Sequence, residues 1–373
     1  MTEKERYLRT GDAALFRLSF LCDPHFVWQR LKAVRSWREG RRRVQDVLRL
    51  LRWRLQDRVF DLRLRAAPAG STKRVKPAPL PPCPSESLPR PHVHLSWNIH
   101  IACNYDCPYC WFHGHWHEFG KAANLVLAPD AWQRHWERFN ARCGPAHIDI
   151  AGGEPFTYPG FLDILERVCK NNTCDVTTNL SLPVEPFLAR MDPARVALSA
   201  SFHPESAGDP QAFIEKLLRL RQAGFRAEAF VVAWPPTLLR MQELVGRFRE
   251  HGIALNVQPF RGEWRGRAYP RGYTAAARAL LERLIQGGLQ DQPATEDAQR
   301  VLTYQLAEKP TSGRLCNAGV LYGRIQANGD VTRCAQGGRL IGSFLSEDFR
   351  LCEKAEPCPF PNCPCINEMS YIL

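Results

Sequence analysis

The sequence lacks an uninterrupted apolar run of the ~18 residues that a transmembrane helix needs. The most apolar stretch near the N-terminus, Ala13–Cys22, is short and contains Arg17. This pattern predicts neither a membrane-spanning helix nor a cleaved signal peptide. A composition with 45% hydrophobic and 24% charged residues is typical of a soluble globular protein.

Acidic residues are scarce at the start of the chain. Residues 1–90 contain 21 Lys and Arg but 9 Asp and Glu, a surplus of 12 (21 − 9) that equals the net charge of the whole chain, +12. The remaining residues are therefore formally neutral. A neutral body does not offer the basic groove that nucleic acid requires, so no nucleic-acid partner is expected.

Cysteine, in contrast, is abundant, with 14 residues. Disulfide-rich secreted proteins are usually much smaller, and a chain of 373 residues can bury a core without disulfides. Metal binding in a reducing cytoplasm is the better interpretation. The isolated cysteines are expected to be small buried side chains or surface thiols: Cys22, Cys83, Cys143, Cys169 and Cys174.

Residues 1–65 form a basic N-terminal segment. From Val44 to Leu62, apolar residues recur at helical spacing among arginines, which predicts a basic amphipathic helix. Such a helix packs on the body of the protein or lies at a membrane surface, and the second alternative would make the protein membrane-peripheral. Residues 66–91 contain eight prolines, which favour extended structure and predict a linker.

From residue 92 onward, short apolar runs alternate with amphipathic stretches. The predicted strands are His92–Ala102, His147–Gly152, Cys174–Asn179, Val196–Phe202, Arg226–Ala233 and Ile253–Gln258. The predicted helices are Asp130–Arg142, Pro159–Asn171, Val184–Met191, Pro210–Ala223 and Thr237–His251. Repeated strand–helix units predict an α/β domain with a parallel sheet over residues 92–262, either a partial (β/α)6 TIM-like barrel or an open doubly wound sheet.

The first predicted strand runs directly into a loop with three cysteines, Cys103, Cys107 and Cys110. Thiolates are preferred ligands of iron–sulfur clusters, and three ligands on a four-iron cluster leave one iron open for chemistry. Structural zinc is the alternative, because a histidine of the segment 111–117 can supply a fourth ligand. These histidines can also serve in proton transfer, or the segment can simply form an aromatic cover over the loop.

The triad and one further motif resemble the radical S-adenosylmethionine (SAM) superfamily. The CxxxCxxC loop has Tyr109 before its last cysteine, and Gly152-Gly153-Glu154-Pro155 ends the second predicted strand, as the family's GGEP motif does. We interpret the glycines as allowing the backbone to approach a ligand, and Glu154 as an acceptor for the SAM ammonium group.

The resemblance implies a partial (β/α)6 barrel and a catalytic 4Fe-4S cluster held by the triad. It also implies that SAM binds the open iron, that an external donor such as flavodoxin or ferredoxin supplies an electron, and that a 5'-deoxyadenosyl radical removes a substrate hydrogen. By the same resemblance, strand-end polar residues lie near SAM, although each can equally be a simple cap. These are Thr178, Asn179, Ser199, Ser201 and His203.

Residues 263–373 are predicted to form a helical connection, near Thr274–Gln286, and a small C-terminal cysteine-rich hairpin domain. Asn328-Gly329 lies between the apolar runs Leu321–Gln326 and Val331–Cys334, which is a strong signal for a β-hairpin. Cysteines on either side of this hairpin should therefore lie close together at its open end.

The hairpin resembles the start of the SPASM and twitch domains, which hold auxiliary clusters in radical SAM enzymes. That resemblance implies a second 4Fe-4S cluster, while zinc stays an alternative. Cys352 is a weaker ligand candidate. The expected ligands are Cys316, Cys334, Cys358 and Cys363, with Cys365 as a substitute.

Together these features predict a radical SAM oxidoreductase that acts on a small molecule such as a sugar, a cyclitol or a lipid-linked glycan, with the auxiliary cluster accepting an electron. The alternatives are modification of a ribosomal peptide, against which the helical character of residues 1–65 argues, and a zinc-binding nucleic-acid module.

Overall fold

The computed structural model describes residues 55, 58–59, 61–63, 93–110, 125–287, 301–307, 310–336, 339–363 and 371–372. The chain divides into two compact units, Met1–Arg65 and Ala66–Leu373. In the first unit the described residues are helical. The other residues of the predicted basic helix, and the whole proline-rich segment 66–91, lie outside the described residues.

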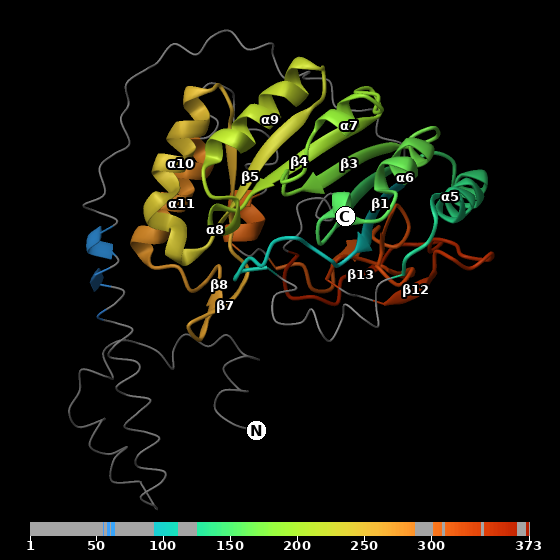
Figure 1. The fold of residues 1–373 in the computed structure, drawn as a ribbon. Helices are drawn as coiled ribbons and strands as arrows, with labels where there is room; N and C mark the ends of the chain where they lie inside the picture. Colours follow the sequence, from blue (N-terminus) through green and yellow to red (C-terminus); the bar gives the residue numbers. More distant parts are fainter. Residues whose placement is uncertain are drawn as a thin grey trace, which may run out of the picture. The chain divides into compact units, whose positions relative to one another are not determined.

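A nine-stranded sheet forms the framework of the second unit, in the order β12-β11-β10-β1-β2-β3-β4-β5-β6. The strands from β1 to β6 are parallel and adjacent in chain order (Figure 1). Their bounds are β1 (Val93–His100), β2 (Ala146–Gly152), β3 (Thr173–Thr178), β4 (Val196–Phe202), β5 (Ala227–Ala233) and β6 (Leu255–Pro259).

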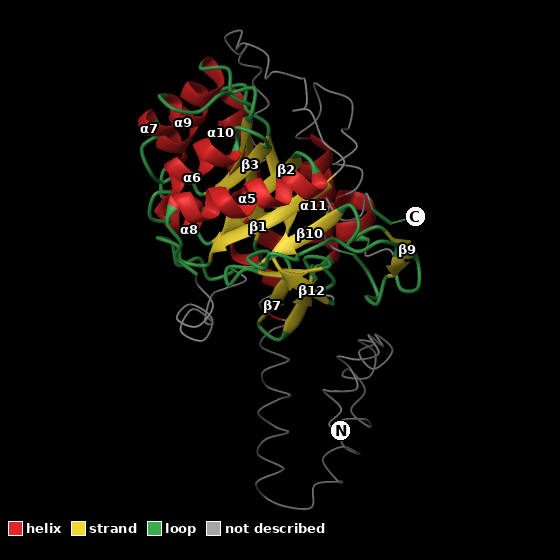
Figure 2. Ribbon diagram, turned by 90° about the vertical axis from the view of Figure 1, so that its right-hand side faces the viewer, coloured by secondary structure: helices red, strands yellow, loops and turns green. Residues whose placement is uncertain are grey.

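Helices connect these strands and lie along the outer side of the curved sheet (Figures 1 and 2). The longer ones are α5 (Pro129–Cys143), α6 (Phe161–Val168), α9 (Pro210–Gln222), α10 (Leu238–Glu250) and α11 (Ala275–Gly287). Shorter ones are η2 (Pro155–Thr157), α7 (Glu185–Leu188), α8 (Pro204–Ala207), η3 (Pro235–Thr237) and the π-helical η4 (Val301–Leu306). The prediction of a partial (β/α)6 barrel is confirmed.

The hydrophobic core lies between the sheet and the helices. Side chains alternate between the two faces of a strand, and on β1 Leu95, Trp97 and Ile99 are fully buried. The ring of Trp97 packs against Trp132 and Trp136 of α5, with centroids 4.7 and 5.4 Å apart. Aromatic pairs of this kind bury a large apolar area, which holds α5 against the first strand.

The opposite face of the sheet, which we call the interior face, carries polar side chains. They are half-buried, with Thr177 exposed, and include His94, Ser96, Asp149, Asp175, Thr177, Ser199, Ser201, Glu228, Asn256 and Gln258. The interior of a complete TIM barrel is packed with branched apolar residues instead. A polar, partly accessible face is therefore suited to contact with water or a polar ligand.

The C-terminal hairpin joins the same sheet. β10 (Tyr322–Ile325) pairs parallel with β1, while β11 (Asp330–Thr332) and β12 (Leu340–Ser343) continue antiparallel. The predicted hairpin is thus confirmed, but its pairing with β1 was not predicted. Two small ribbons complete the described strands: β7 (Gly262–Trp264) with β8 (Arg267–Tyr269), and β9 (Leu315–Cys316) with β13 (Glu356–Pro357).

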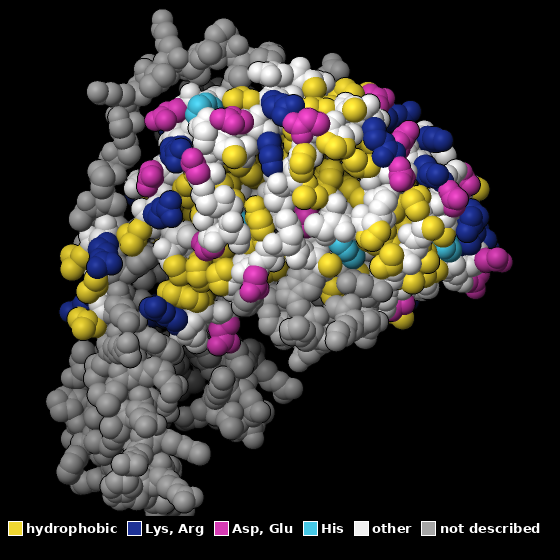
Figure 3. Space-filling model, in the orientation of Figure 1, with side chains coloured by type: hydrophobic (Ala, Val, Ile, Leu, Met, Phe, Trp, Pro, Cys, Tyr) yellow, Lys and Arg dark blue, Asp and Glu magenta, His cyan; other side chains and the backbone are white. Residues whose placement is uncertain are grey.

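The described surface shows no separation of charge on the face drawn in Figure 3. Basic and acidic side chains alternate over the outer helices there, in agreement with the formal neutrality of residues 91–373. No helix in the described part of the chain combines the length and the hydrophobicity needed to cross a bilayer.

Charged groups meet on the interior face near the N-terminal ends of β2, β3 and β5. Arg226 donates from Nη2 to Asp175 (3.0 Å) and from Nη1 to Glu228 (3.4 Å). Asp175 and Asp149 are register partners on neighbouring strands. Burial, together with the negative charge of Asp149, raises the pKa of Asp175 to about 6, although Arg226 opposes the rise.

The Asp175→Asn variant is expected to raise the free energy of unfolding at pH 8. An acid whose pKa is raised by folding destabilises the folded state when it is ionised, so the penalty is full above the folded pKa and vanishes as the pH falls toward ~4. Denaturant unfolding should show a gain of about 1–3 kcal/mol at pH 8 and little change at pH 4. Glu250→Gln, at an exposed carboxylate, is the control, and an equal effect of Asp175→Asn at both pH values would contradict the explanation.

Candidate active site

The three cysteines of the triad lie on the loop that leaves the C-terminal end of β1. Cys107 is buried, whereas Cys103 and Cys110 are half-buried. The backbone N–H of Cys110 donates to the carbonyl of Cys107 at 3.0 Å, which turns the chain back between these two residues. All three thiols therefore belong to one short loop at the edge of the sheet where barrel proteins carry their functional residues.

Polar groups from the following strands contact two of these thiols. The Sγ of Cys103 accepts from the backbone N–H of Tyr105 at 3.4 Å and lies 3.8 Å from Nδ2 of Asn179. The Sγ of Cys107 lies 3.4 Å from the hydroxyl of Ser206. Such donors stabilise a thiolate, so the surroundings favour the ligand form of these sulfurs.

Burial acts in the opposite direction on the free thiols. It raises the pKa of Cys107 to about 11 and also raises the pKa of Cys103. Without a metal these groups therefore stay protonated at neutral pH, and metal binding must release their protons. A soft, sulfur-only donor set with one buried and two half-buried thiols fits an iron–sulfur cluster well.

The GGEP segment lies directly against the start of the cysteine loop. Gly153 donates to the carbonyl of His100 at 2.9 Å, and Glu154 donates to the carbonyl of Ala102 at 2.8 Å. A Cβ on Gly152 or Gly153 would collide with these same backbone carbonyls. The glycines thus allow the second strand's end to approach the chain's own backbone closely.

Glu154 is almost completely buried, at 1% exposure. Its carboxylate accepts from the backbone N–H of Asn179 (2.6 Å), from the hydroxyl of Thr178 (2.8 Å) and from the N–H of Phe156 (3.2 Å). Burial raises the pKa of this carboxyl, against the effect of the three donors. Glu154 therefore connects the ends of β2 and β3 and fixes the residue that contacts Cys103.

Aromatic side chains cover the loop near Cys110. The hydroxyl of Tyr109 lies 3.0 Å from Nδ1 of His203, and the Tyr109 ring packs against Trp234 with centroids 5.5 Å apart. Burial lowers the pKa of His203 to about 4, so this imidazole is neutral at pH 7. Trp264 of the β7–β8 ribbon in turn contacts Trp234, with centroids 6.3 Å apart.

Sequence reasoning missed several of these contacts. Ser206 and Trp234 were not recognised, although Trp234 directly follows the predicted strand Arg226–Ala233 and Ser206 lies four residues after the predicted strand Val196–Phe202. Ser199 and Ser201, which were predicted to lie near SAM, are on the interior face of β4 and are half-buried. The histidine-containing segment 111–117 lies outside the described residues.

A second group of cysteines lines a small, partly open cavity in the C-terminal region. Four thiols around one cavity suit a fully ligated cluster, or a zinc ion. They are the four preferred candidates, Cys316, Cys334, Cys358 and Cys363. Cys352 is not in this lining and instead accepts from Arg339 Nη2 at 3.4 Å, while Cys365 lies outside the described residues.

Arg333 also lines this cavity and is buried at 5% exposure. Its guanidinium donates to the carbonyls of Ala318 (2.7 Å), Cys316 (2.9 Å) and Pro357 (3.1 Å). These bonds tie the segment that carries Cys316 to the segment that precedes Cys358. The positive charge of Arg333 would also offset the negative charge of thiolates at this cavity if a metal were bound there.

The half-barrel carries three cysteines after its first strand and a glycine-rich turn after its second. Residues 97–237 match the family model of the radical SAM superfamily. No curated protein sequence matches the chain.

Solved structures share the fold. A structure of native anSMEcpe with bound AdoMet is 15% identical, with a TM-score of 0.50 over 68% of this chain and 78% of that one. The same protein with AdoMet and the Kp18Cys peptide is 14% identical, with a TM-score of 0.51 and the same coverage. Streptococcus suis SuiB bound to S-adenosylmethionine is 17% identical, with a TM-score of 0.48 over 69% of this chain and 64% of that one.

The Gly153→Ala variant is expected to displace the cysteine loop, because the added methyl group meets the backbone of Ile101 and Ala102. The free energy of unfolding should fall by about 1–3 kcal/mol, as for other overpacked sites. Gly246→Ala in α10 is the matched control, since nothing lies within 4 Å of its added Cβ. Chemical denaturation and iron content after anaerobic reconstitution measure the effect, and equal behaviour of the two variants would argue against the close approach.

Proposed function

We propose that this protein is a radical SAM enzyme whose catalytic 4Fe-4S cluster is held by Cys103, Cys107 and Cys110. The proposal rests on one observation: three thiols on a single loop lie at the C-terminal edge of a half-barrel within the radical SAM domain. Three ligands leave one iron for SAM. When bound, the cluster and SAM would supply a 5'-deoxyadenosyl radical, with the electron drawn from a donor such as flavodoxin or ferredoxin.

The chain's own residues hold this site in place. Asn179 donates to the Sγ of Cys103, and the hydroxyl of Ser206 lies within hydrogen-bond distance of the Sγ of Cys107. Glu154 fixes the position of Asn179 by accepting from its backbone N–H. Tyr109, which is buried within the loop, packs against Trp234 and thereby anchors the loop to the end of β5. We assign SAM contacts to the GGEP segment, from Gly152 to Pro155, and to the strand-end residues Asn179, Ser199 and Ser201.

The substrate that we propose is a small polar molecule such as a sugar, a cyclitol or the headgroup of a lipid-linked glycan. The interior face supports this, because Ser201, Asn256 and Gln258 offer hydrogen-bonding side chains that are only half-buried. Hydroxyl-rich molecules are recognised by groups of this kind, whereas an apolar substrate would leave them unpaired.

We further propose that Cys316, Cys334, Cys358 and Cys363 hold a second 4Fe-4S cluster. A substrate alcohol would lose a hydrogen atom to the adenosyl radical, and then a proton and an electron, to become a carbonyl compound. The electron acceptor would be held by these four thiolates, so the net reaction would be an oxidation. In support of this assignment, all four cysteines line one cavity, and Arg333 donates to backbone carbonyls on two of the segments around it.

Replacing Cys103, Cys107 and Cys110 together by Ala is expected to abolish release of 5'-deoxyadenosine from SAM under anaerobic, dithionite-reduced conditions. The reason is that no iron would remain with an open coordination site. Chromatography of the reaction mixture measures the product. Cys143→Ala, at the end of α5, is the control and should retain cleavage. Full cleavage by the triple variant would refute the catalytic assignment.

Replacing Cys358 and Cys363 together by Ser should lower the iron content from about eight to about four per chain, the values for two clusters and for one. SAM cleavage should persist at least in part, while formation of the oxidised product should stop. Cys352→Ser is the matched control, because this nearby thiol is not part of the cavity lining. If the double variant contains as much iron as the wild type, and the wild type contains one zinc per chain, these cysteines form a zinc site and the proposal of a second cluster is wrong.

A further inference from the structure

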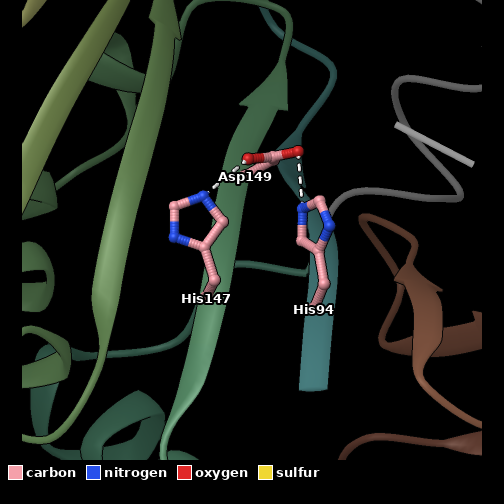
Figure 4. Close-up of side chains that lie close together, drawn as sticks. All are labelled: His94, His147 and Asp149. Atoms are coloured by element: carbon pink, nitrogen blue, oxygen red, sulfur yellow. Dashed lines mark hydrogen bonds and ion pairs between the residues drawn. The ribbon is translucent and has the colours of Figure 1, made fainter. Parts of the chain in front are cut away.

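We propose that His94, His147 and Asp149 form an additional metal site, for a divalent first-row transition-metal ion. The three side chains lie on the interior face of β1 and β2, near the N-terminal ends of these strands (Figure 4). Each can offer one ligand atom, and these atoms all lie within 4.8 Å of one another. The site is independent of the proposed radical chemistry.

The register of the two strands creates this arrangement. His94 and His147 are direct partners across the parallel pair, and Asp149 follows two residues after His147, on the same face. Nε2 of His94 lies 2.7 Å from Oδ2 of Asp149, and Nε2 of His147 lies 3.3 Å from Oδ1. Both imidazoles therefore direct the same ring nitrogen at one carboxylate, as Figure 4 shows.

Hydroxyl groups hold the other nitrogen of each ring. Nδ1 of His94 lies 3.0 Å from the hydroxyl of Tyr371, and Nδ1 of His147 lies 2.9 Å from the hydroxyl of Thr173. Histidines that bind metals usually make such a bond on the far side of the ring, because it fixes the tautomer and the ring orientation. The imidazoles are thus already oriented with Nε2 toward a shared centre.

The group is partly accessible to solvent. The exposed fractions of the side chains are 13% for His94, 7% for His147 and 20% for Asp149, so most of the surface of each side chain is buried, while a small part stays exposed to solvent. Two imidazole nitrogens and one carboxylate oxygen suit Zn²⁺, Fe²⁺, Co²⁺ or Mn²⁺ and leave coordination positions for water. Ca²⁺ and Mg²⁺ prefer all-oxygen sites and do not fit this donor set.

The site is separate from the triad. His94 and His100 are six residues apart on one strand, which places them ~20 Å from each other, and the triad follows beyond His100. Through Tyr371 the site instead reaches the C-terminal cysteine region, since the carbonyl of Tyr371 accepts from the N–H of Asn317 at 2.8 Å. A bound ion would connect β1 with β2 and, through His94 and Tyr371, with the segment that carries Asn317. It would thereby stabilise the region around the cysteine cavity.

The test is an anaerobic Mn²⁺ titration of cluster-loaded protein, followed by electron paramagnetic resonance of free Mn²⁺. Mn²⁺ is the probe because it favours oxygen and nitrogen ligands over thiolates, and the loaded clusters keep the cysteines occupied. Wild-type protein should bind one Mn²⁺ per chain in a saturable manner, and Zn²⁺ should displace it. His94→Gln and His147→Gln should each weaken binding by about tenfold or more.

His251→Gln, at the C-terminal end of α10, is the matched control and should bind Mn²⁺ as the wild type does. Asp149→Asn keeps the size of the side chain but removes its charge, and should weaken binding like the histidine variants. Absence of saturable binding, or equal affinity in the wild type and both histidine variants, overturns the proposal. A loss of thermal stability in these variants without saturable Mn²⁺ binding also overturns it, because the three residues would then form only a hydrogen-bond network. SAM cleavage by the wild type is measured separately, so a failure of the proposed function can be told apart from a failure of the metal-site proposal.

Discussion

The buried carboxylate of Glu154 is the interaction on which the arrangement of the active site depends. It accepts from Thr178, Asn179 and Phe156, while its own backbone N–H and carbonyl pair with Ala102 and His100. One residue therefore connects the ends of β1, β2 and β3. A buried carboxylate is costly unless its oxygens are hydrogen-bonded, so loss of any of these donors would also disturb the loop that carries the cysteines.

The C-terminal region is built onto the same framework. β10 extends the sheet along β1, Arg333 joins the two segments that carry Cys316 and Cys358, and His94 of β1 contacts Tyr371. Strand β1 thus leads to the triad at one end and contacts the second cysteine region along its side. Within the proposed function, this gives both clusters fixed positions on one sheet, which electron transfer from a substrate radical would require.

The polarity of the interior face has a cost in stability and a use in binding. Asp149, Asp175 and Glu228 bring negative charge together there, and Arg226 pairs with Asp175 and Glu228. Burial, together with the charge of Asp149, still raises the pKa of Asp175. An apolar packing of the same strands would be more stable but could not bind a polar ligand. The same face also carries the proposed transition-metal site, at its N-terminal end.

Local pattern alone determined much of this protein. Alternating apolar runs predicted the six parallel strands to within two residues at every end. The spacing of Cys103, Cys107 and Cys110, together with Gly152-Gly153-Glu154-Pro155, indicated the similarity to the radical SAM superfamily, because these signals lie within short segments. Only the tertiary structure decided which distant residues meet. Four contacts join residues that lie far apart in the chain. They are the pairing of β10 with β1, the contacts of Ser206 and Trp234 with the triad loop, the hydrogen bonds of Arg333 at the cysteine cavity and the contact of His94 with Asp149. No local periodicity encodes them, since they arise from strand order and register.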